Sequence, residues 1–396
     1  MAQKRTKVCR SKTELTQKFT FAKKKSMRKE LGVNMVKRIG VLTGGGDCPG
    51  LNAVLRAVVK TAIIKYGYEV IGYKDGYRGL VLNNFIKLKA SDVSGILDKG
   101  GTILGTSNSD NPFKFKVEKN GEIEVKDMSD RIINNVEMFG IDGLVIIGGE
   151  GTLKIARDLS KKGLKVVGVP KTIDNDLSAT EATFGFMTAV DTATEAIDKL
   201  HSTAESHHRV MILEVMGRYA GWIALEAGIA GGADVILIPE IPYDINKVAQ
   251  KIMERKNAGK GFSIVVVAEG AGLNIKEIEE ANKNKPVYEE PKQIGGIGNK
   301  IAEDIEKLTG IQTRVTVLGY LQRGGRPIPY DRILSTRYGV AAVDLVSQGK
   351  FGLMVSLNGD QVSAVPLEDA VSKLKTVPPD GELVNIAKSL GVGFGD

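Results

Sequence analysis

A dense group of chemically capable side chains lies in the stretch VVGVPKTIDNDL, residues 166–177. A buried-strand pattern ends there, and Lys171, Thr172, Asp174 and Asp176 follow at once. Two carboxylates this close repel each other unless a cation or a shared proton stabilises them. A carboxylate also activates a hydroxyl nucleophile by taking its proton in the transition state. Asp174 is therefore the candidate base, with Asp176 assisting through a metal, a water or a hydrogen bond. Thr172 is expected to orient a transferring phosphate, and a solvated acidic turn is the alternative reading.

Two glycine-rich turns predict phosphate binding. GGGDCPGLN, residues 44–52, and IGGEGT, residues 147–152, each follow an apolar strand and precede a helical pattern. Bare backbone N–H groups at a helix N-terminus suit a phosphate, although many such turns hold no ligand. Glu150 is placed to reach a phosphate-bound Mg²⁺, since this ion prefers oxygen ligands. An acidic first helical turn is the alternative for this residue.

Four arginines supply the cationic groups that a sugar phosphate needs. Guanidinium groups bind phosphate oxygens with a geometry that lysine lacks. Taken singly, each arginine is an ordinary surface ion-pair residue; together, beside glycine turns, they indicate an anion site. Glu269, at the end of VVVAEG, is an acceptor for sugar hydroxyls or a structural ion-pair residue. The four arginines are Arg209, Arg218, Arg314 and Arg323.

The elements that must position these residues alternate between strands and helices. Runs that are apolar on both faces, separated by helical patterns such as 192–206, 245–259 and 298–310, indicate parallel sheets covered on both sides. Ligands bind beyond the carboxyl ends of strands in such sheets, where the glycine turns and the acids fall. The expected fold is α/β, with two Rossmann-like three-layer domains and mainly parallel sheets.

Charge and composition exclude several classes of protein. Residues 1–34 hold 11 Lys/Arg against Glu14 and Glu30, whereas the rest of the chain is nearly neutral, so the net charge of +8 gives no reason to expect nucleic-acid binding. No apolar run approaches the roughly 18 residues of a membrane span. Cys9 and Cys48 cannot form a disulfide framework and suit a reducing cytoplasm. Residues 1–34 are expected to be a disordered extension ahead of a start at Met35; a targeting peptide or a nucleic-acid arm are the alternatives.

The ordered set of motifs resembles the 6-phosphofructokinase family over about residues 37–346. It rests on GGDCPGLNAVLR, DGYRGL, GGEGT, PKTIDND, EVMGRYAGW, VLGYLQRGG and YDR. The resemblance implies transfer of a phosphoryl group to the 1-hydroxyl of fructose 6-phosphate, with Asp174 as base and Arg218 and Thr172 as catalytic partners. It implies Mg²⁺ at Glu150. Sugar-phosphate contacts fall on Thr172, Asp174, Asp176, Arg209, Met216, Gly217, Arg218, Glu269, Arg314, Tyr320 and Arg323. Nucleotide contacts fall on Gly46, Tyr77, Asn108, Gly149, Glu150, Gly151 and Thr152.

Two positions bear on the phosphoryl donor in this family. Pyrophosphate enzymes resemble GGEDT, where an aspartate intrudes on the space of the α-phosphate, whereas Gly151 leaves it open. Lys171 is the pyrophosphate-type residue. We expect ATP as donor, because steric and charge exclusion is harder to escape than an extra lysine; pyrophosphate is the alternative. Asn108 replaces an arginine that many relatives direct at the transferring phosphate.

The resemblance also implies an organisation. It places a donor domain at 35–185 plus 322–372 and a fructose 6-phosphate domain at 186–321 plus 373–396. Arg209 and Arg314 match arginines that the family donates from a neighbouring subunit, so we expect a homo-oligomer, dimer or tetramer. An NAD or lipid kinase with a related glycine turn is disfavoured by PKTIDND and MGR. A catalytically dead regulatory subunit is disfavoured by the presence of Asp174.

Overall fold

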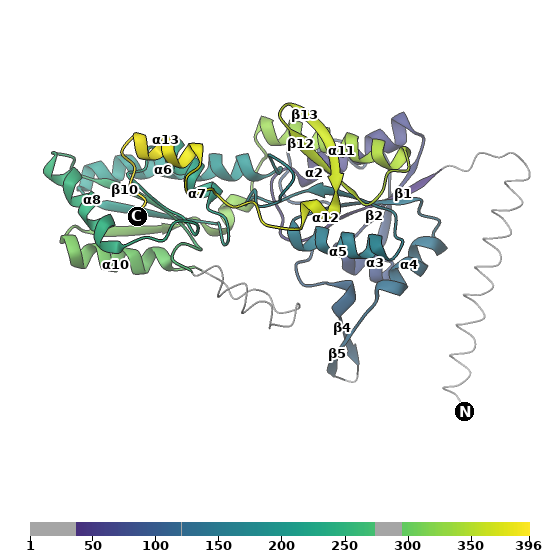
Figure 1. The fold of residues 1–396 in the computed structure, drawn as a ribbon. Coiled ribbons are helices and arrows are strands. Elements are labelled where there is room, and N and C mark those ends of the chain that lie inside the picture. Colours follow the sequence, from purple (N-terminus) through teal and green to yellow (C-terminus); the bar gives the residue numbers. More distant parts are fainter. Residues whose placement is uncertain (1–36, 120, 274–294) are drawn as a thin grey trace, which may run out of the picture.

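The computed structural model describes residues 37–119, 121–273 and 295–396. They form two α/β units joined side by side, each with helices on both faces of a sheet (Figure 1). The expectation for residues 1–34 lies outside the described residues. Within the described part of the chain, no helix is both long and apolar enough to cross a membrane.

The larger sheet has seven strands in the order β13-β12-β7-β6-β1-β2-β3. Its central strands pair in parallel, and its two edge strands, β3 and β13, pair antiparallel with β2 and β12. The central strands are buried on both faces, as their uninterrupted apolar runs predict. The strands are β1 (Arg38–Thr43), β2 (Glu69–Tyr73), β3 (Phe85–Leu88), β6 (Gly143–Gly148), β7 (Val166–Pro170), β12 (Leu353–Asn358) and β13 (Gln361–Pro366).

Alternate residues of these strands face two different helical layers. Val41 and Val145 pack in the core with α2 (Leu51–Lys60) and α11 (Pro329–Ser347), while Leu42 and Leu144 pack in the core on the opposite face. That face is covered by α3 (Tyr77–Leu82), α4 (Ser129–Met138), α5 (Glu150–Lys161) and α12 (Leu367–Ala370). A two-stranded hairpin, β4 (Phe115–Lys119) and β5 (Glu122–Lys126), projects from this unit after the turn η2 (Pro112–Lys114) (Figure 1).

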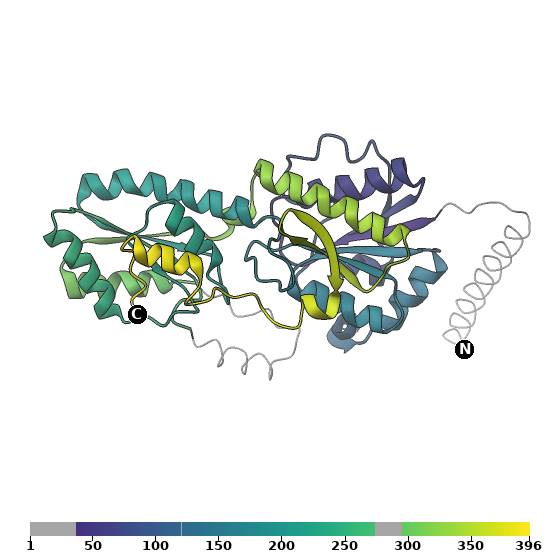
Figure 2. The same cartoon turned by 45° about the horizontal axis from the view of Figure 1, so that its top comes forward.

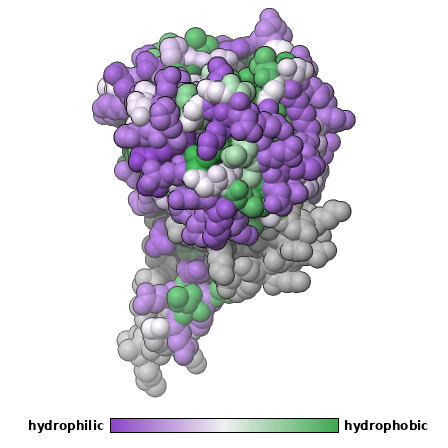
Figure 3. All heavy atoms as spheres, turned by 90° about the vertical axis from the view of Figure 1, so that its left-hand side faces the viewer, coloured by the Kyte–Doolittle hydropathy of each residue, from purple (hydrophilic) through white to green (hydrophobic). Residues whose placement is uncertain are grey.

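The smaller sheet has four parallel strands in the order β11-β8-β10-β9. The strands are β8 (Val210–Val215), β9 (Val235–Leu237), β10 (Ser263–Ala268) and β11 (Thr313–Val317). One face carries α6 (Phe186–His207), α7 (Trp222–Ala230) and α13 (Glu382–Ser389), and the other carries α8 (Ile245–Asn257) and α10 (Ile297–Thr309) (Figure 2). The outer end of this unit is largely hydrophilic (Figure 3).

The chain crosses between the two units more than once. Helix α6 leaves the larger unit beside α11 and covers the smaller sheet. The chain returns to the larger unit through η3 (Gly319–Arg323), between β11 and α11. The π-helical segment η1 (Thr61–Lys65) continues α2 within the larger unit. The fold is thus α/β with mainly parallel sheets in two Rossmann-like units, as expected from the sequence.

Candidate active site

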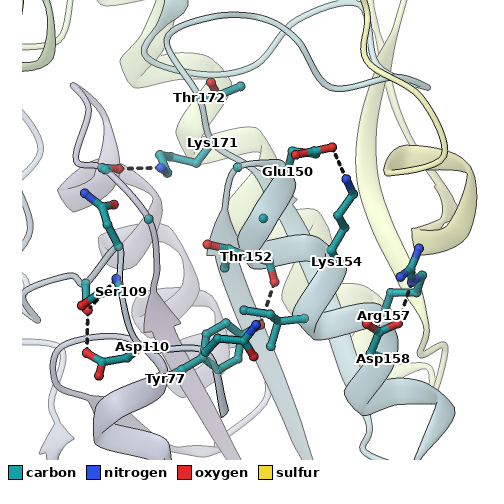
Figure 4. A pocket seen from close by; sticks show the side chains of 18 of the residues that line it. Tyr77, Ser109, Asp110, Glu150, Thr152, Lys154, Arg157, Asp158, Lys171 and Thr172 are labelled. Atoms are coloured by element: carbon teal, nitrogen blue, oxygen red, sulfur yellow. Dashed lines mark hydrogen bonds and ion pairs between the residues drawn. The ribbon is translucent and has the colours of Figure 1, made fainter. Parts of the chain in front are cut away.

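A cavity of about 590 Å³ opens where the carboxyl ends of β1, β6 and β7 meet the first turns of α5. Figure 4 shows side chains from several separate segments pointing into it. This position is the edge at which ligands bind in parallel α/β sheets. Its lining includes Gly45, Gly46, Tyr77, Asn108, Gly149, Glu150, Gly151, Thr152, Lys171, Thr172, Asp174, Asp176 and Arg323.

The glycines of both turns allow close approaches that a side chain would block. A Cβ on Gly148 would lie 2.3 Å from the Cβ of Thr152, and a Cβ on Gly46 would lie 2.5 Å from Nη1 of Arg323. Gly44 donates its N–H to the carbonyl of Ile147 at 2.9 Å, which joins the two turns. The glycines therefore bring two stretches of backbone and an arginine to one wall of the cavity.

Gly151 differs from these packed glycines. A Cβ at this position would meet no atom within 4 Å, and Gly151 lines the cavity. Its hydrogen faces free volume at the N-terminal end of α5, where backbone N–H groups favour an anion. A carboxylate there would place negative charge in that volume.

The first turns of α5 also carry Glu150, Thr152 and Lys154. Glu150 forms an ion pair with Lys154 one turn along the helix (Figure 4). The hydroxyl of Tyr77 donates to the carbonyl of Thr152 at 2.7 Å, and burial raises the pKa of this tyrosine. Tyr77 therefore contributes its ring to the cavity wall, while its hydroxyl is already bonded within the fold.

Lys171 is 3% exposed and lies against the first glycine turn. Its Nζ donates to the carbonyl of Gly46 at 2.5 Å (Figure 4). Burial lowers the pKa of this amine, while the charges of Asp174 and Asp176 act to raise it. Lys171 thus supplies positive charge near Asp174 and Asp176, whose two carboxylates would otherwise repel each other. It also holds the glycine turn at Gly46 in place.

The two acids occupy different electrostatic environments in the same cavity. Burial raises the pKa of Asp174, and the positive charges of Arg323 and Lys171 oppose this rise. Burial, followed by the charges of Asp174 and Glu150, raises the pKa of Asp176 to about 7. The backbone N–H of Asp174 donates to the hydroxyl of Thr172 at 3.1 Å, so this turn is ordered by its own side chains.

The predicted sugar-binding residues Met216, Gly217, Arg218 and Glu269 follow the carboxyl ends of β8 and β10. They belong to the smaller sheet and are not part of the cavity lining. Burial, followed by the charge of Asp174, raises the pKa of Glu269 to about 7. The Nε of Arg218 is buried and has no hydrogen-bond partner among the described residues. A buried guanidinium donor without a partner, on a loop that follows a strand paired with the one preceding Glu269, indicates a site built for an anionic, hydroxylated ligand.

Residues of η3 connect the two sheets at this point. Arg323 donates through Nη1 to the carbonyl of Asp47 at 3.3 Å and lines the cavity. Gln322 accepts the N–H of Met216 at 3.2 Å. Tyr320 is 69% exposed and lies outside the cavity.

Arg209 and Arg314 lie away from this cavity. Strand pairing places Val210 opposite Thr313, so both arginines flank the amino ends of β8 and β11. Met216 follows the carboxyl end of the six-residue β8, roughly 20 Å along the strand. Arg209 donates to the side chain of Gln312 at 2.5 Å. These two arginines are therefore neighbours of each other and not of the acids.

Several cavity residues were not identified from the sequence. Ile155 and Asp158 follow Glu150 and Gly151 on α5, and Phe113 and Lys114 come from η2. A signal existed for the α5 residues, because positions four apart on a helix share a face. The contribution of η2 arises from its packing after the long connection of residues 89–111 from β3, and has no local signature. The residues missed are Ser107, Ser109, Asp110, Asn111, Phe113, Lys114, Lys154, Ile155, Arg157 and Asp158.

The residues present fit Mg²⁺ that arrives with phosphate oxygens. No group of three or more His, Cys, Asp or Glu in the described ranges could hold a metal ion by itself. Oδ1 of Asp176 is buried without a hydrogen-bond partner in the described structure, and the negative charge of Glu150 lies close enough to raise its pKa. Mg²⁺ commonly binds through one or two carboxylates together with substrate phosphates. Glu150 and Asp176 are the residues that suit this arrangement.

The fold and the cavity together define a class of protein. Two glycine turns at strand ends, a helix N-terminus, a buried lysine and a pair of acids are the components of an α/β phosphotransferase site. A family model described as Phosphofructokinase matches residues 38–346, and the chain belongs to the phosphofructokinase family.

Curated relatives match nearly the full length of the chain. ATP-dependent 6-phosphofructokinase 2 of Clostridium perfringens is 60% identical over 363 residues, which cover 91% of this chain and 99% of the relative. ATP-dependent 6-phosphofructokinase of Chloroflexus aurantiacus is 53% identical over 361 residues, covering 91% and 98%.

Solved structures share the fold. The T-state phosphofructokinase of Pichia pastoris superposes with a TM-score of 0.73 at 32% identity, over 86% of this chain and 36% of that longer chain. The pyrophosphate-dependent phosphofructokinase of Marinobacter aquaeolei has a TM-score of 0.72 at 24% identity, over 91% and 88% of the two chains, a level that shows the fold alone.

Proposed function

We propose that the chain is an ATP-dependent 6-phosphofructokinase, which transfers the terminal phosphoryl group of ATP to the 1-hydroxyl of fructose 6-phosphate in glycolysis. The observation that carries this proposal is the meeting of Asp174 and Asp176 with two phosphate-suited glycine turns in one nucleotide-sized cavity. The relatives at 53–60% identity bear the name of the ATP-dependent enzyme over nearly their whole length.

In the proposed reaction Asp174 accepts the proton of the sugar hydroxyl as that oxygen attacks the phosphorus atom. Burial favours this role, because a raised pKa makes a carboxylate a stronger base. The positive charges of Arg323 and Lys171 act in the other direction and favour the anionic form. Thr172, which already bonds the backbone of Asp174, is placed to orient the transferring group.

The sugar is proposed to lie between the two units. Arg218 has an unused buried donor for the 6-phosphate or the transferring phosphate, and Glu269 is an acceptor for sugar hydroxyls. Met216 and Gly217 supply backbone at the same strand end, and Arg323 spans toward the donor cavity. Catalysis is then mainly positioning and charge neutralisation, to which bound Mg²⁺ contributes by offsetting phosphate charge.

The cavity supports ATP over pyrophosphate. Its lining follows α5 from Glu150 to Asp158, which is about 12 Å along a helix. Phosphates would occupy the glycine end, and the apolar Phe113 and Ile155 offer a surface for the base. Pyrophosphate has no nucleoside and would not use the part of the cavity beyond the glycine turns. The open volume at Gly151 leaves room for the α-phosphate.

Lys171 is compatible with either donor. Its amine is held by the Gly46 carbonyl, so part of its role is to shape the phosphate-binding turn. Asn108 lines the cavity where many relatives place an arginine, and the positive charge of Lys171 nearby is proposed to compensate in part.

The proposed division of labour follows the two sheets. Residues 35–185 plus 322–372 would bind the donor, and residues 186–321 plus 373–396 would bind fructose 6-phosphate. We place the enzyme in the cytoplasm with its glycolytic substrates.

We further propose that the active enzyme is a homo-oligomer, dimer or tetramer. Arg209 and Arg314 lie together at the far end of the smaller sheet, and β11 is an edge strand there. Two adjacent guanidinium groups remote from their own cavity are suited to complete the anion site of a neighbouring subunit.

A coupled assay tests the donor and the acceptor together. Purified enzyme with fructose 6-phosphate and Mg²⁺ is given ATP in one reaction and pyrophosphate in the other, and fructose 1,6-bisphosphate is measured. We expect turnover with ATP at least about tenfold above that with pyrophosphate. A preference for pyrophosphate would refute the donor assignment, and no product with either donor would refute the function.

A further inference from the structure

A short segment near the C-terminus, residues 374–377, joins two loops of the site. On one side Leu374 pairs with Leu177 in an isolated antiparallel β-bridge. The backbone N–H of Lys375 there donates to the carbonyl of Asp176 at 2.8 Å. On the other side the indole N–H of Trp222 donates to the carbonyl of Lys375 at 2.9 Å. The segment thus contacts the loop of the two acids and the start of α7, four residues after Arg218.

A second contact strengthens the link to the smaller unit. The N–H of Val377 donates to Oε1 of Glu240 at 2.8 Å, and the same carboxylate accepts the N–H of Gly221 at 3.0 Å. Gly221 ends the loop that carries Arg218. One four-residue segment is therefore linked to both loops that flank the proposed sugar site, directly to the loop of the acids and through Glu240 to the loop of Arg218.

The side chain of Lys375 makes the most specific of these contacts. Its Nζ donates to Oδ1 of Asn175 at 2.9 Å, to the carbonyl of Thr180 at 3.1 Å and to the carbonyl of Glu181 at 2.8 Å. An ammonium group has three N–H donors, and here each has an oxygen acceptor. Nζ also lies 5.8 Å from the ring centroid of Trp222, within the range of a cation–π contact.

Asn175 explains why this anchoring matters for the acids. Its φ is +50°, in the left-handed region that costs an ordinary residue about 1 kcal/mol or more. Its Oδ1 also accepts the N–H of Thr183 at 3.2 Å, so the side chain is held from two directions. Because Asn175 separates Asp174 from Asp176, its backbone conformation sets the directions of both carboxylates.

We propose that Lys375 is a positioning residue for phosphoryl transfer: it fixes Asn175, and through it Asp174 and Asp176, and couples this loop to Trp222 beside the Arg218 loop. This inference rests on the proposed function, since it concerns the same reaction. Lys375 does not line the cavity and touches no reacting atom in this role. The negatively charged groups that face its amine are Asp176, Glu181 and Glu226.

Lys375→Met is the direct test, with Lys373→Met, two residues earlier in the chain, as the matched control. Lys373 is exposed, so its replacement should leave kcat, KM and fluorescence unchanged. Lys375→Met is expected to lower kcat by about 10- to 100-fold, the scale of a misplaced catalytic group. The KM for ATP should stay within about twofold, because the hydrogen bonds and the ring contact of the Lys375 amine do not include the glycine turns or α5, which are proposed to bind the phosphates.

Fluorescence gives a readout that does not depend on turnover. Trp222 is the only tryptophan of the chain, so its emission reports this contact directly. Loss of the ammonium over the ring should shift its emission in Lys375→Met and not in Lys373→Met. Lys375→Arg, which can still donate to several oxygens, should recover part of the lost kcat.

Three results would overturn the proposal. One is a folded Lys375→Met enzyme with kcat within about twofold of the unsubstituted protein. Another is an equal loss of activity in Lys373→Met. If Lys375→Met does not fold, Trp222→Phe decides, since it removes the indole N–H that bonds the carbonyl of Lys375 while it keeps a smaller aromatic ring; a kcat unchanged in Trp222→Phe would exclude the coupling. An unsubstituted enzyme inactive on fructose 6-phosphate would instead refute the proposed function, while the fluorescence shift would still support the Lys375–Trp222 link.

Discussion

At the scale of single residues, the site contains buried polar groups that lack hydrogen-bond partners. Asp176 and Arg218 each have a buried polar atom without a hydrogen bond in the described chain. Buried polar groups are nearly always paired in folded proteins, so exceptions indicate a ligand or a stored cost. These two, among five such atoms in the described residues, lie where the two substrates are proposed to meet.

Asp176→Asn tests the energetic cost of that arrangement. Burial raises the folded-state pKa of Asp176 to about 7 from an ordinary value of 3.8, so folding favours the protonated carboxyl. The stability from this group is complete below about pH 4 and is lost as pH rises through about 7. The neutral amide avoids this loss, and its Tm should exceed that of the unsubstituted enzyme at pH 8 by about 2–4 °C.

Thermal unfolding of both proteins from pH 5 to pH 8 measures this effect. The difference in Tm should shrink toward pH 5, while the activity of Asp176→Asn falls at every pH. A Tm difference that is constant with pH would show that the carboxyl is not strained in the folded enzyme.

Gly151→Asp tests whether the open volume at Gly151 is what allows ATP to serve as the donor. The new carboxylate would enter the open volume beside the N-terminal end of α5 and repel a phosphate, at a cost of several kcal/mol for like charges brought together. We expect kcat/KM for MgATP to fall by at least about 100-fold. Gly151→Ala is the matched control, since a methyl group meets no atom there; an equal loss in both variants would point to backbone damage instead.

At the scale of elements, α6 depends on a cap from a distant helix. Asp331, on α11, accepts hydrogen bonds from the N–H of Gly185 at 3.0 Å and the N–H and hydroxyl of Thr188 at 2.8 and 2.6 Å. The two N–H groups are orphan backbone donors at the N-terminus of α6. The same carboxylate therefore fixes the entry of the helix that joins the two sheets.

Asp331→Ala should lower the free energy of unfolding by about 2–4 kcal/mol, because three donors lose a buried charged acceptor. Denaturant unfolding measures it, with Asp380→Ala, at an exposed position, as the control. A change below about 0.5 kcal/mol would contradict the capping role.

The elements were predictable where their signals are local. Apolar runs such as residues 143–148 predicted the parallel strands, and the glycine turns predicted the edge that holds the cavity. The antiparallel strands β3 and β13 were not identified, although the Asn358-Gly359 dipeptide, at the end of β12 and the start of its turn to β13, is a hairpin signal. The start of α6 was placed at residue 192 and lies at Phe186, because its cap comes from Asp331, more than 140 residues away.

The residues of the candidate site, too, were predictable only where the sequence carries a local signal. Asp174, Glu150 and Gly151 were found because motif and strand end coincide in the sequence, and the structure brings them together. Lys375 was missed because its partners Asn175, Thr180 and Glu181 lie about 200 residues away, and no spacing rule connects them.

At the scale of the whole molecule, the separation of Arg209 and Arg314 from the cavity predicts complementation between subunits. Arg209→Ala and Asp174→Ser enzymes should each have little activity alone. Hybrids made by mixed refolding should regain up to about a quarter of the activity, since some sites would then combine an intact Asp174 with a neighbour's intact Arg209. Activity that stays at the level of the parent variants after proven subunit exchange would show that each subunit uses its own arginine.

The most direct test of the account is the turnover of Asp174→Ser with saturating fructose 6-phosphate and MgATP. A lost general base predicts a kcat lower by about 10²–10⁴-fold, with the KM for ATP nearly unchanged. Serine at this position with kcat within about threefold of the unsubstituted enzyme would contradict the assignment of Asp174, and with it the proposed arrangement of the site.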